Sequence, residues 1–322
     1  MEEIPRSHDA FAWLYFLDTG VSTTDSEGRV VPSAINGRIL RCRPDGSSFQ
    51  EVLTDLKSLP DGIAIDPPNE HIYWTNMERP SVNNGSIQRC TLSGENVEII
   101  VSSGTTFTPK QVAIAPISQK IYWADREGMK IMRANLDGSH IEVVYYASSQ
   151  HPVQDNSLNW CVGIAVDERY EVIYWSQRGP SKGGQGRIFR MKLEMNHGEP
   201  AGNRSDIECL LVGLPEPIQL ALDSQSQILY WTDRGDPPFG NTVNSVSLAD
   251  SNGRPLPVDF LEPKILVQGL HEGIGIAIDL NGRRLFFTDF EGSLYSSKLD
   301  GSEKIVIFRG IGTIAGIAYI DK

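Results

Sequence analysis

A histidine, a lysine and a glutamine stand where side chains could donate a proton or a hydrogen bond. Lys110-Gln111 and His271-Glu272 each directly precede a short apolar run. An imidazole changes charge near neutral pH and suits general acid–base catalysis, whereas an ammonium or amide group can donate a hydrogen bond to a carbonyl. We predict that His271, Lys110 and Gln111 are catalytic and that Glu272 contacts the substrate. The alternative for each is a purely structural role at the end of a strand.

One aromatic residue and several charged ones could bind the substrate. Trp160 also precedes an apolar run, and its indole ring could stack on a flat conjugated molecule. The predicted binding residues are Trp160, Asp61, Gln219, Glu272, Arg126, Arg178, Arg234 and Phe239. The alternatives are core packing for Trp160 and ion pairs with nearby acids for the arginines.

The motifs of common catalytic sites are missing from the sequence. It contains no G-x-S-x-G, H-E-x-x-H, P-loop or dinucleotide-binding glycine pattern. Residues 179–184 are rich in glycine but lack the strand-to-helix context of a phosphate-binding loop. No cysteine and histidine cluster suggests zinc. We therefore expect neither a metal nor a cofactor.

Composition excludes several classes of partner. The 322 residues carry a net charge of -12 and no basic run, which argues against nucleic acid. No apolar stretch approaches the roughly 20 residues of a membrane span. The four cysteines form no C-x-x-C pair, and residues 1–6 do not have the basic and apolar pattern of a secretory signal. We predict free thiols and a cytoplasmic protein.

A sequence repeat must position all of these residues. A five-residue signature recurs, consisting of an apolar residue, two aromatics, a small or branched residue, and an acid or amide. Its six copies are residues 14–18, 72–76, 121–125, 173–177, 229–233 and 285–289. Such periodicity indicates an array of similar folding units. The acids that end the signature are expected to bind backbone groups where blades meet.

Each repeat contains four short strand patterns. In the third repeat they cover 111–115, 120–124, 130–136 and 141–145, with turns such as Asp137-Gly138 between them. Four antiparallel strands per unit, repeated radially, form the blades of a β-propeller. The first repeat lacks its first strand, and residues 315–321 can supply it. We predict an all-β, six-bladed β-propeller over residues 1–322, a single domain in which the C-terminal strand completes the first blade.

The repeats resemble the YWTD family, the class B repeat of the low-density lipoprotein receptor. Tyr230-Trp231-Thr232-Asp233 is a complete copy, and the accompanying Leu-Asp-Gly occurs at 136–138 and 299–301. Without a disulfide framework or flanking modules, the sequence is most similar to free-standing intracellular YWTD proteins of fungi. That resemblance implies a hetero-Diels–Alderase, which joins a tropolone-type quinone methide to a humulene-type alkene without a redox cofactor. Its implied partners are small molecules, an apolar terpene and a conjugated electrophile.

Loop lengths predict which face of the propeller holds the site. The second-to-third strand loops 19–37, 77–85, 178–186 and 234–241 are longer than their equivalents in the third and sixth repeats, which have about four residues. In a propeller these loops share one face with the connections into the innermost strands. We expect those connections to carry Asp61, Lys110, Gln111, Gln219 and His271. A cycloaddition needs mainly a reactive pose, which can supply effective molarities of about 10^5–10^8 M.

Two other functions stay open at this point. Six-bladed propellers include calcium-dependent lactonases, which bind the metal on the axis. In this sequence Glu216, Asn159 and Asp61 could approximate the ligands, although the offsets of these three residues from the inner strands are uneven. A propeller can also bind a protein through the same face, as receptor propellers do. A deep cavity of roughly 300–1,000 Å³ would favour a small ligand, and a shallow polar face would favour a protein.

Overall fold

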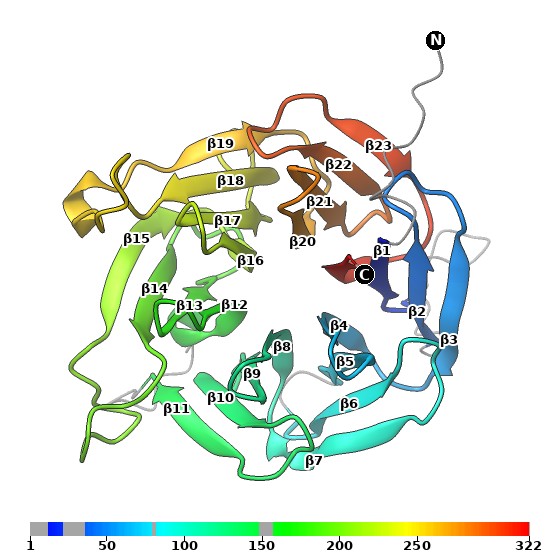
Figure 1. Ribbon diagram of the computed structural model, residues 1–322, viewed down its shortest axis with the longest axis horizontal. Helices are drawn as coiled ribbons and strands as arrows, with labels where there is room; N and C mark the ends of the chain where they lie inside the picture. Colours follow the sequence, from blue (N-terminus) through cyan, green and yellow to red (C-terminus); the bar gives the residue numbers. More distant parts are fainter. Residues whose placement is uncertain (1–11, 22–35, 79–81, 148–156, 322) are drawn as a thin grey trace.

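The computed structural model describes residues 12–21, 36–78, 82–147 and 157–321. Its strands form six four-stranded antiparallel sheets around a common axis, which confirms the predicted six-bladed β-propeller (Figure 1). Each blade is numbered by its signature copy.

From the innermost strand outward, blade 1 consists of β24 (Ile314–Ile320), β1 (Trp13–Asp18), β2 (Gly37–Cys42) and β3 (Gln50–Leu56). Blade 2 consists of β4 (Pro60–Asp66), β5 (His71–Asn76), β6 (Gly85–Thr91) and β7 (Glu98–Thr106). Blade 3 consists of β8 (Pro109–Ala115), β9 (Lys120–Asp125), β10 (Lys130–Asn135) and β11 (Glu142–Tyr146). Blade 4 consists of β12 (Cys161–Asp167), β13 (Val172–Gln177), β14 (Gly186–Lys192) and β15 (Glu208–Leu214). Blade 5 consists of β16 (Pro217–Asp223), β17 (Ile228–Asp233), β18 (Thr242–Ser247) and β19 (Lys264–Val267). Blade 6 consists of β20 (Gly273–Asp279), β21 (Arg284–Asp289), β22 (Leu294–Lys298) and β23 (Ile305–Phe308). Two 3-10 turns, η1 (Ser157–Asn159) and η2 (Val258–Phe260), complete the described elements.

The two ends of the described chain meet in blade 1. β1 pairs with β2 on one side and with β24 on the other, in a register from Trp13 opposite Ile320 to Asp18 opposite Ile314. β24 also contacts β20 and β4, the inner strands of the two neighbouring blades. The C-terminal strand therefore completes the first blade, as predicted, and covers an edge that would otherwise be open.

The signature residues attach each blade to the next. The aromatic side chains are buried, and the Tyr73 hydroxyl donates a hydrogen bond to the carbonyl of Leu136 in blade 3 (3.1 Å). The Thr75 hydroxyl accepts from the Gly62 N–H of its own blade (2.9 Å) and donates to the Lys110 carbonyl of the next (2.6 Å). The same pair of bonds is made by Ser176, Thr232 and Thr288.

The acid that ends the signature binds the connection into the inner strand. Asp125 accepts hydrogen bonds from the N–H groups of Phe107 and Thr108, both at 2.8 Å. Asp233 accepts from the Glu216 N–H at 2.9 Å. These carboxylates hold the residues that flank the axis at fixed positions.

The inner strands begin earlier than predicted. Each of them contains a register shift near its start, where two residues face one residue of the second strand, as in a β-bulge. Asp61 and Lys110 therefore lie within β4 and β8, and not in the connections where we expected them, whereas Gln111 and Gln219 lie within β8 and β16, next to those connections. The sequence pattern missed them because the bulge places polar residues inside a strand.

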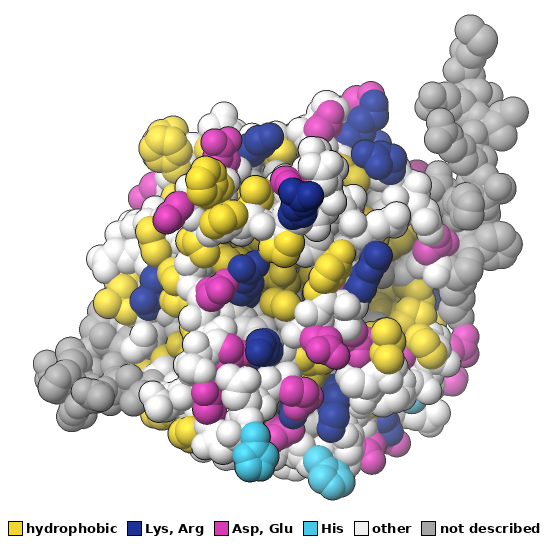
Figure 2. Space-filling model, turned by 60° about the vertical axis from the view of Figure 1, so that its left-hand side comes forward, with side chains coloured by type: hydrophobic (Ala, Val, Ile, Leu, Met, Phe, Trp, Pro, Cys, Tyr) yellow, Lys and Arg dark blue, Asp and Glu magenta, His cyan; other side chains and the backbone are white. Residues whose placement is uncertain are grey.

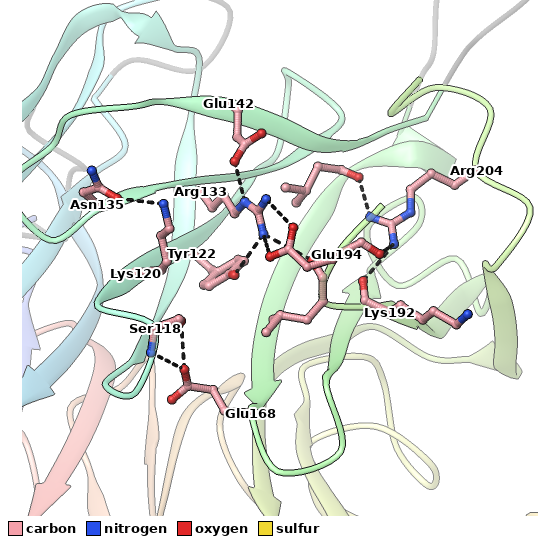
Figure 3. Close-up of polar contacts among 12 residues, drawn as sticks. Ser118, Lys120, Tyr122, Arg133, Asn135, Glu142, Glu168, Lys192, Glu194 and Arg204 are labelled. Atoms are coloured by element: carbon pink, nitrogen blue, oxygen red, sulfur yellow. Dashed lines mark hydrogen bonds and ion pairs between the residues drawn. The ribbon is translucent and has the colours of Figure 1, made fainter. Parts of the chain in front are cut away.

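Buried arginines join blades 3 and 4 on the outer side of the ring (Figure 3). The Arg204 side chain is fully buried and donates to the carbonyls of Val144 (3.0 Å) and Lys192 (2.8 Å). Arg133 binds Glu142 and Glu194, at 2.6 and 2.5 Å. Residues 193–207, between β14 and β15, are thereby fixed against β11.

Two of the long loops can be traced completely. Residues 178–185 connect β13 to β14 and residues 234–241 connect β17 to β18, whereas blades 3 and 6 use only residues 126–129 and 290–293. In the predicted loops 19–37 and 77–85, residues 22–35 and 79–81 lie outside the described residues. Within the described ranges, neither 3-10 turn is long and apolar enough to cross a membrane.

Candidate functional site

Six residues that directly follow the signatures surround the axis at one level. Each donates its backbone N–H to a carbonyl in the connection that leads into the inner strand of its own blade, as Arg178 does to Trp160 (3.3 Å) and Arg234 does to Glu216 (2.9 Å). We call them the crown ring: Thr19, Met77, Arg126, Arg178, Arg234 and Phe290. Three arginines on blades 3, 4 and 5 form its cationic half, and Phe290, Thr19 and Met77 on blades 6, 1 and 2 form its neutral half.

The second residues of the six inner strands form another ring, which we call the axis ring. Its members are Asp61, Lys110, Val162, Ile218, Ile274 and Ala315, all buried. The four apolar members belong to a single packed cluster. Lys110 Nζ lies 3.0 Å from Met77 Sδ, so the axis ring adjoins the crown ring. The centre of the propeller is therefore filled with side chains at this level.

The two charged members of the axis ring form a buried ion pair. Lys110 Nζ donates to Asp61 Oδ1 at 2.6 Å, and Gln111 Nε2 donates to Asp61 Oδ2 at 3.2 Å. Burial lowers the pKa of Lys110 to about 8, and the positive charges of Arg126 and Arg234 act in the same direction against the attraction of Asp61. Three of the predicted residues, Asp61, Lys110 and Gln111, are thus brought together.

Trp160 lies among the arginines of the cationic half. The guanidinium carbons of Arg126 and Arg178 are 5.1 and 4.9 Å from the centre of its ring, which is the range of cation–π contacts. The fully buried carboxylate of Glu216 accepts from Arg178 at 2.5 Å and from Arg234 at 2.6 Å. Glu216 was expected only as a possible metal ligand, whereas in the structure it holds two arginines.

A pocket of about 620 Å³ opens beside the neutral half. It is lined by Phe290, His271, Glu272, Asn241, Thr313, Glu291 and Gly312. His271 is exposed, with its Nδ1 3.5 Å from Glu291 Oε2. Glu272 lies 4.0 Å from Arg234, so the pocket borders the cationic half.

The predicted site residues therefore fall into separate groups. The described contacts do not join His271 to Lys110, because His271 is exposed on the rim of the pocket while Lys110 is buried in the axis ring. Gln219 is buried, and its side chain accepts from the Ile276 N–H at 3.2 Å. Phe239 is 67% exposed on the loop 234–241 and does not line the pocket. Phe290 and Met77 were not predicted, although both directly follow a signature, as the three arginines do, and that shared position could have identified them.

The residues proposed for a lactonase-type metal do not fit one. Glu216 binds two arginines and Asp61 binds Lys110 and Gln111, so neither carboxylate is free to bind a cation. In the part of the chain that the structure describes, no three acidic, histidine or cysteine residues are grouped to hold a metal.

The substitution Asp233→Asn should change how stability depends on pH. Burial raises the pKa of Asp233 to about 7, from about 3.9 for an unfolded aspartate. Between these values the folded state keeps a proton that the unfolded state has lost. The contribution of Asp233 to stability is therefore complete below about pH 4 and lost as the pH rises to about 7. Denaturant titrations should show the unfolding free energy of wild type falling, relative to the variant, over this range; a constant difference would contradict the assignment.

Comparison with known proteins supports the fold and identifies the relatives. The chain is 45% identical over 312 residues to low-density lipoprotein receptor-related protein 1 of Pyricularia oryzae, a match that covers 95% of this chain and 97% of the relative. The chain belongs to the family of that protein. It is also 36% identical to the 3-hydroxyacyl-CoA dehydrogenase-like protein LAM1 of Cochliobolus heterostrophus, of which it spans 64%. No family model matches the chain.

Solved structures share the architecture of this YWTD propeller. A chain in the crystal structure of a nidogen–laminin complex superposes with a TM-score of 0.70 at 19% identity and covers 96% of this chain and 98% of its own. A gluconolactonase from Xanthomonas campestris gives a TM-score of 0.56 at 18% identity and covers 80% of this chain and 78% of its own. At these identities the likeness concerns the fold alone.

Proposed function

We propose that this protein is a hetero-Diels–Alderase of fungal natural-product biosynthesis that joins a tropolone-type quinone methide to a humulene-type sesquiterpene alkene. The observation that carries the proposal is the crown ring, where strong hydrogen-bond donors face an aromatic ring on one side and lie beside a 620 Å³ pocket on the other. The pocket volume lies within the range of small-molecule sites. The proposal includes two small molecules as partners and a cytoplasmic location.

The reaction needs positioning more than it needs a catalytic base. The conjugated carbonyl of the quinone methide contributes four π electrons and the alkene two, so that one C–C and one C–O bond form and no atom is lost. A guanidinium of Arg126 or Arg178 would hydrogen-bond the carbonyl oxygen and make the diene more electrophilic. His271, exposed at the pocket, would protonate a hydroxyl that leaves as water, and the ring hydroxyl of the precursor would lose its proton to solvent, so that the neutral quinone methide forms; such acid catalysis is worth roughly 10^2 to 10^4 in rate.

The selectivity of the reaction provides the test. The full chain is incubated with a tropolone quinone-methide precursor and a humulene-type alkene, and the ratio of isomeric adducts is compared with that from heat-unfolded protein and from buffer. We expect one adduct to dominate only with folded protein, at a rate at least about tenfold above background. An adduct ratio equal to that in buffer would reject the proposal.

A protein-binding propeller is the second candidate, because the pocket is open and its rim carries exposed polar side chains such as His271 and Glu291. Acidic and basic side chains also intermingle on the face shown in Figure 2. Recovery of one stoichiometric protein partner, lost on substitution of these rim residues, would favour it.

A further inference from the structure

We propose that Asn241 is a positioning residue, which holds His271 at the edge of the pocket for its part in the reaction. This role rests on the proposed function, in which His271 donates a proton. Asn241 ends the long loop 234–241 of blade 5, whereas His271 lies in the connection into β20 of blade 6. Both residues line the 620 Å³ pocket.

The connection into the inner strand of blade 6 departs from the pattern of blades 1, 3 and 5. In those blades the signature aspartate accepts a hydrogen bond from the N–H group of the residue directly before the inner strand, at 3.1, 2.8 and 2.9 Å. In blade 6 that residue is Glu272, but Asp289 accepts from the N–H group of His271, one residue earlier, at 3.2 Å. The N–H group of Glu272 is therefore left to a different acceptor.

Asn241 supplies that acceptor from the neighbouring blade. Its side-chain Oδ1 accepts from the Glu272 N–H group at 2.8 Å, and its backbone carbonyl accepts from the Leu270 N–H group at 3.0 Å. These two bonds lie on either side of His271 in the chain. The His271 carbonyl in turn accepts from the Phe290 N–H group at 3.1 Å. The backbone of His271 is thus held from two blades.

The backbone of Glu272 shows what this clamp maintains. Among the six residues that directly precede an inner strand, all within the described ranges, Glu272 alone has a left-handed φ, of +59°. A glutamate rarely adopts this conformation, which persists only where surrounding contacts hold it. At this turn the neighbouring side chains have different partners: His271 Nδ1 lies 3.5 Å from Glu291 Oε2, and Glu272 Oε1 lies 3.6 Å from Lys182 Nζ.

Loss of the Asn241 amide should therefore displace His271 without removing its imidazole. The Glu272 N–H group would lose its acceptor, and the left-handed turn would lose a bond that holds it. A general acid must lie within hydrogen-bond reach of the group it protonates, and a displacement of about 1 Å can lower a rate by up to about 10^2. The expected defect lies in the chemical step more than in substrate binding.

Two substitutions at one position test this role. Asn241→Gly removes the amide, and glycine adopts the φ of Asn241, +56°, without strain. Asn241→Asp keeps an oxygen acceptor there. In the adduct assay with the full chain, we expect Asn241→Gly to lower kcat at least about tenfold with little change in KM, and Asn241→Asp to keep most of the wild-type kcat. Asn96→Gly is the matched control, the same replacement at a φ of +55° in the turn between β6 and β7, and should leave kcat unchanged.

A double-substitution cycle shows whether Asn241 acts through His271. His271→Gln removes the proton donor, so adding Asn241→Gly to it should lower kcat by less than about twofold more. Hydrogen exchange over residues 268–274, followed by mass spectrometry, gives a readout that needs no reaction. The Glu272 amide should exchange at least about tenfold faster in Asn241→Gly than in wild type, and at the wild-type rate in Asn241→Asp.

A full tenfold loss from Asn241→Gly in the His271→Gln background would overturn the inference, as would an Asn241→Asp variant as slow as Asn241→Gly. Unprotected exchange of the Glu272 amide in wild type would do the same, which keeps the test valid if Asn241→Gly does not fold. A wild type that forms no adduct would reject the proposed function and this role with it. An active wild type in which the two substitutions act independently would reject the role of Asn241 alone.

Discussion

Deleting residues 310–322 should prevent the chain from folding. The deletion removes β24, the inner strand of blade 1, and with it the buried side chains of Ile314, Ala315, Ile317 and Ile320. β1 would lose one of its two partners, and β20 and β4 would lose the strand that lies between them. Because a typical domain is stable by only about 5–15 kcal/mol, losing these buried side chains together with a whole strand pairing should unfold the chain.

Circular dichroism and thermal melting of the purified truncated chain measure this outcome. We expect no cooperative transition and extensive aggregation, because the open edge of β1 can pair with other chains. A synthetic peptide of residues 310–322, added during refolding, should restore a cooperative melt, whereas a scrambled peptide should not. A soluble truncated chain that melts cooperatively by itself would contradict closure by the C-terminal strand.

Removing the negative partner of the buried ion pair should be the most damaging single substitution at the axis. Asp61→Asn leaves the Lys110 ammonium buried without a counter-charge, which costs up to about 3–5 kcal/mol. The double variant Asp61→Asn/Lys110→Met removes both charges and should regain most of that loss. Its new methionine would join the apolar residues that already fill four positions of the axis ring. The new amide of residue 61 can also donate to Gln111 Oε1, a buried acceptor without a partner.

Denaturant titrations of wild type, Asp61→Asn, Lys110→Met and the double variant at pH 7 provide the measurement. A double variant as unstable as Asp61→Asn would show that the unpaired charge of Lys110 in apolar surroundings is not the cause of the lost stability. An Asp61→Asn variant as stable as wild type would show that the pair is not buried. Where the titration shows that the double variant keeps the fold, its adduct rate reports whether Lys110 acts as a donor in the reaction.

Much of the fold could be predicted because the signature residues make the contacts between blades. Tyr73 and Thr75 each bond to the following blade, so the sequence that repeats is also the sequence that assembles the ring. The strand starts were less predictable. The bulge near the start of β8 brings Lys110 from a connection into the strand, and a hydropathy pattern does not show a bulge.

The candidate site was only partly predictable for a related reason. Trp160 and the three arginines could be selected from their types and positions, and the structure brings them together. Their arrangement depends on Glu216, which holds Arg178 and Arg234 from a different connection. His271 seemed equivalent to Lys110 in sequence, but the backbone directs it to the rim. Side-chain direction around the axis is a three-dimensional property that spacing alone does not contain.

A crystal structure of the full chain with its adduct bound tests the central claim most directly. We predict that the conjugated ring of the adduct lies against Trp160 with its oxygens on Arg126 and Arg178, and that its terpene part extends over Phe290 into the adjoining pocket. An adduct bound away from the crown ring, for example in the groove lined by His71 and Arg89 between blades 2 and 3, would contradict the claim even with the propeller intact.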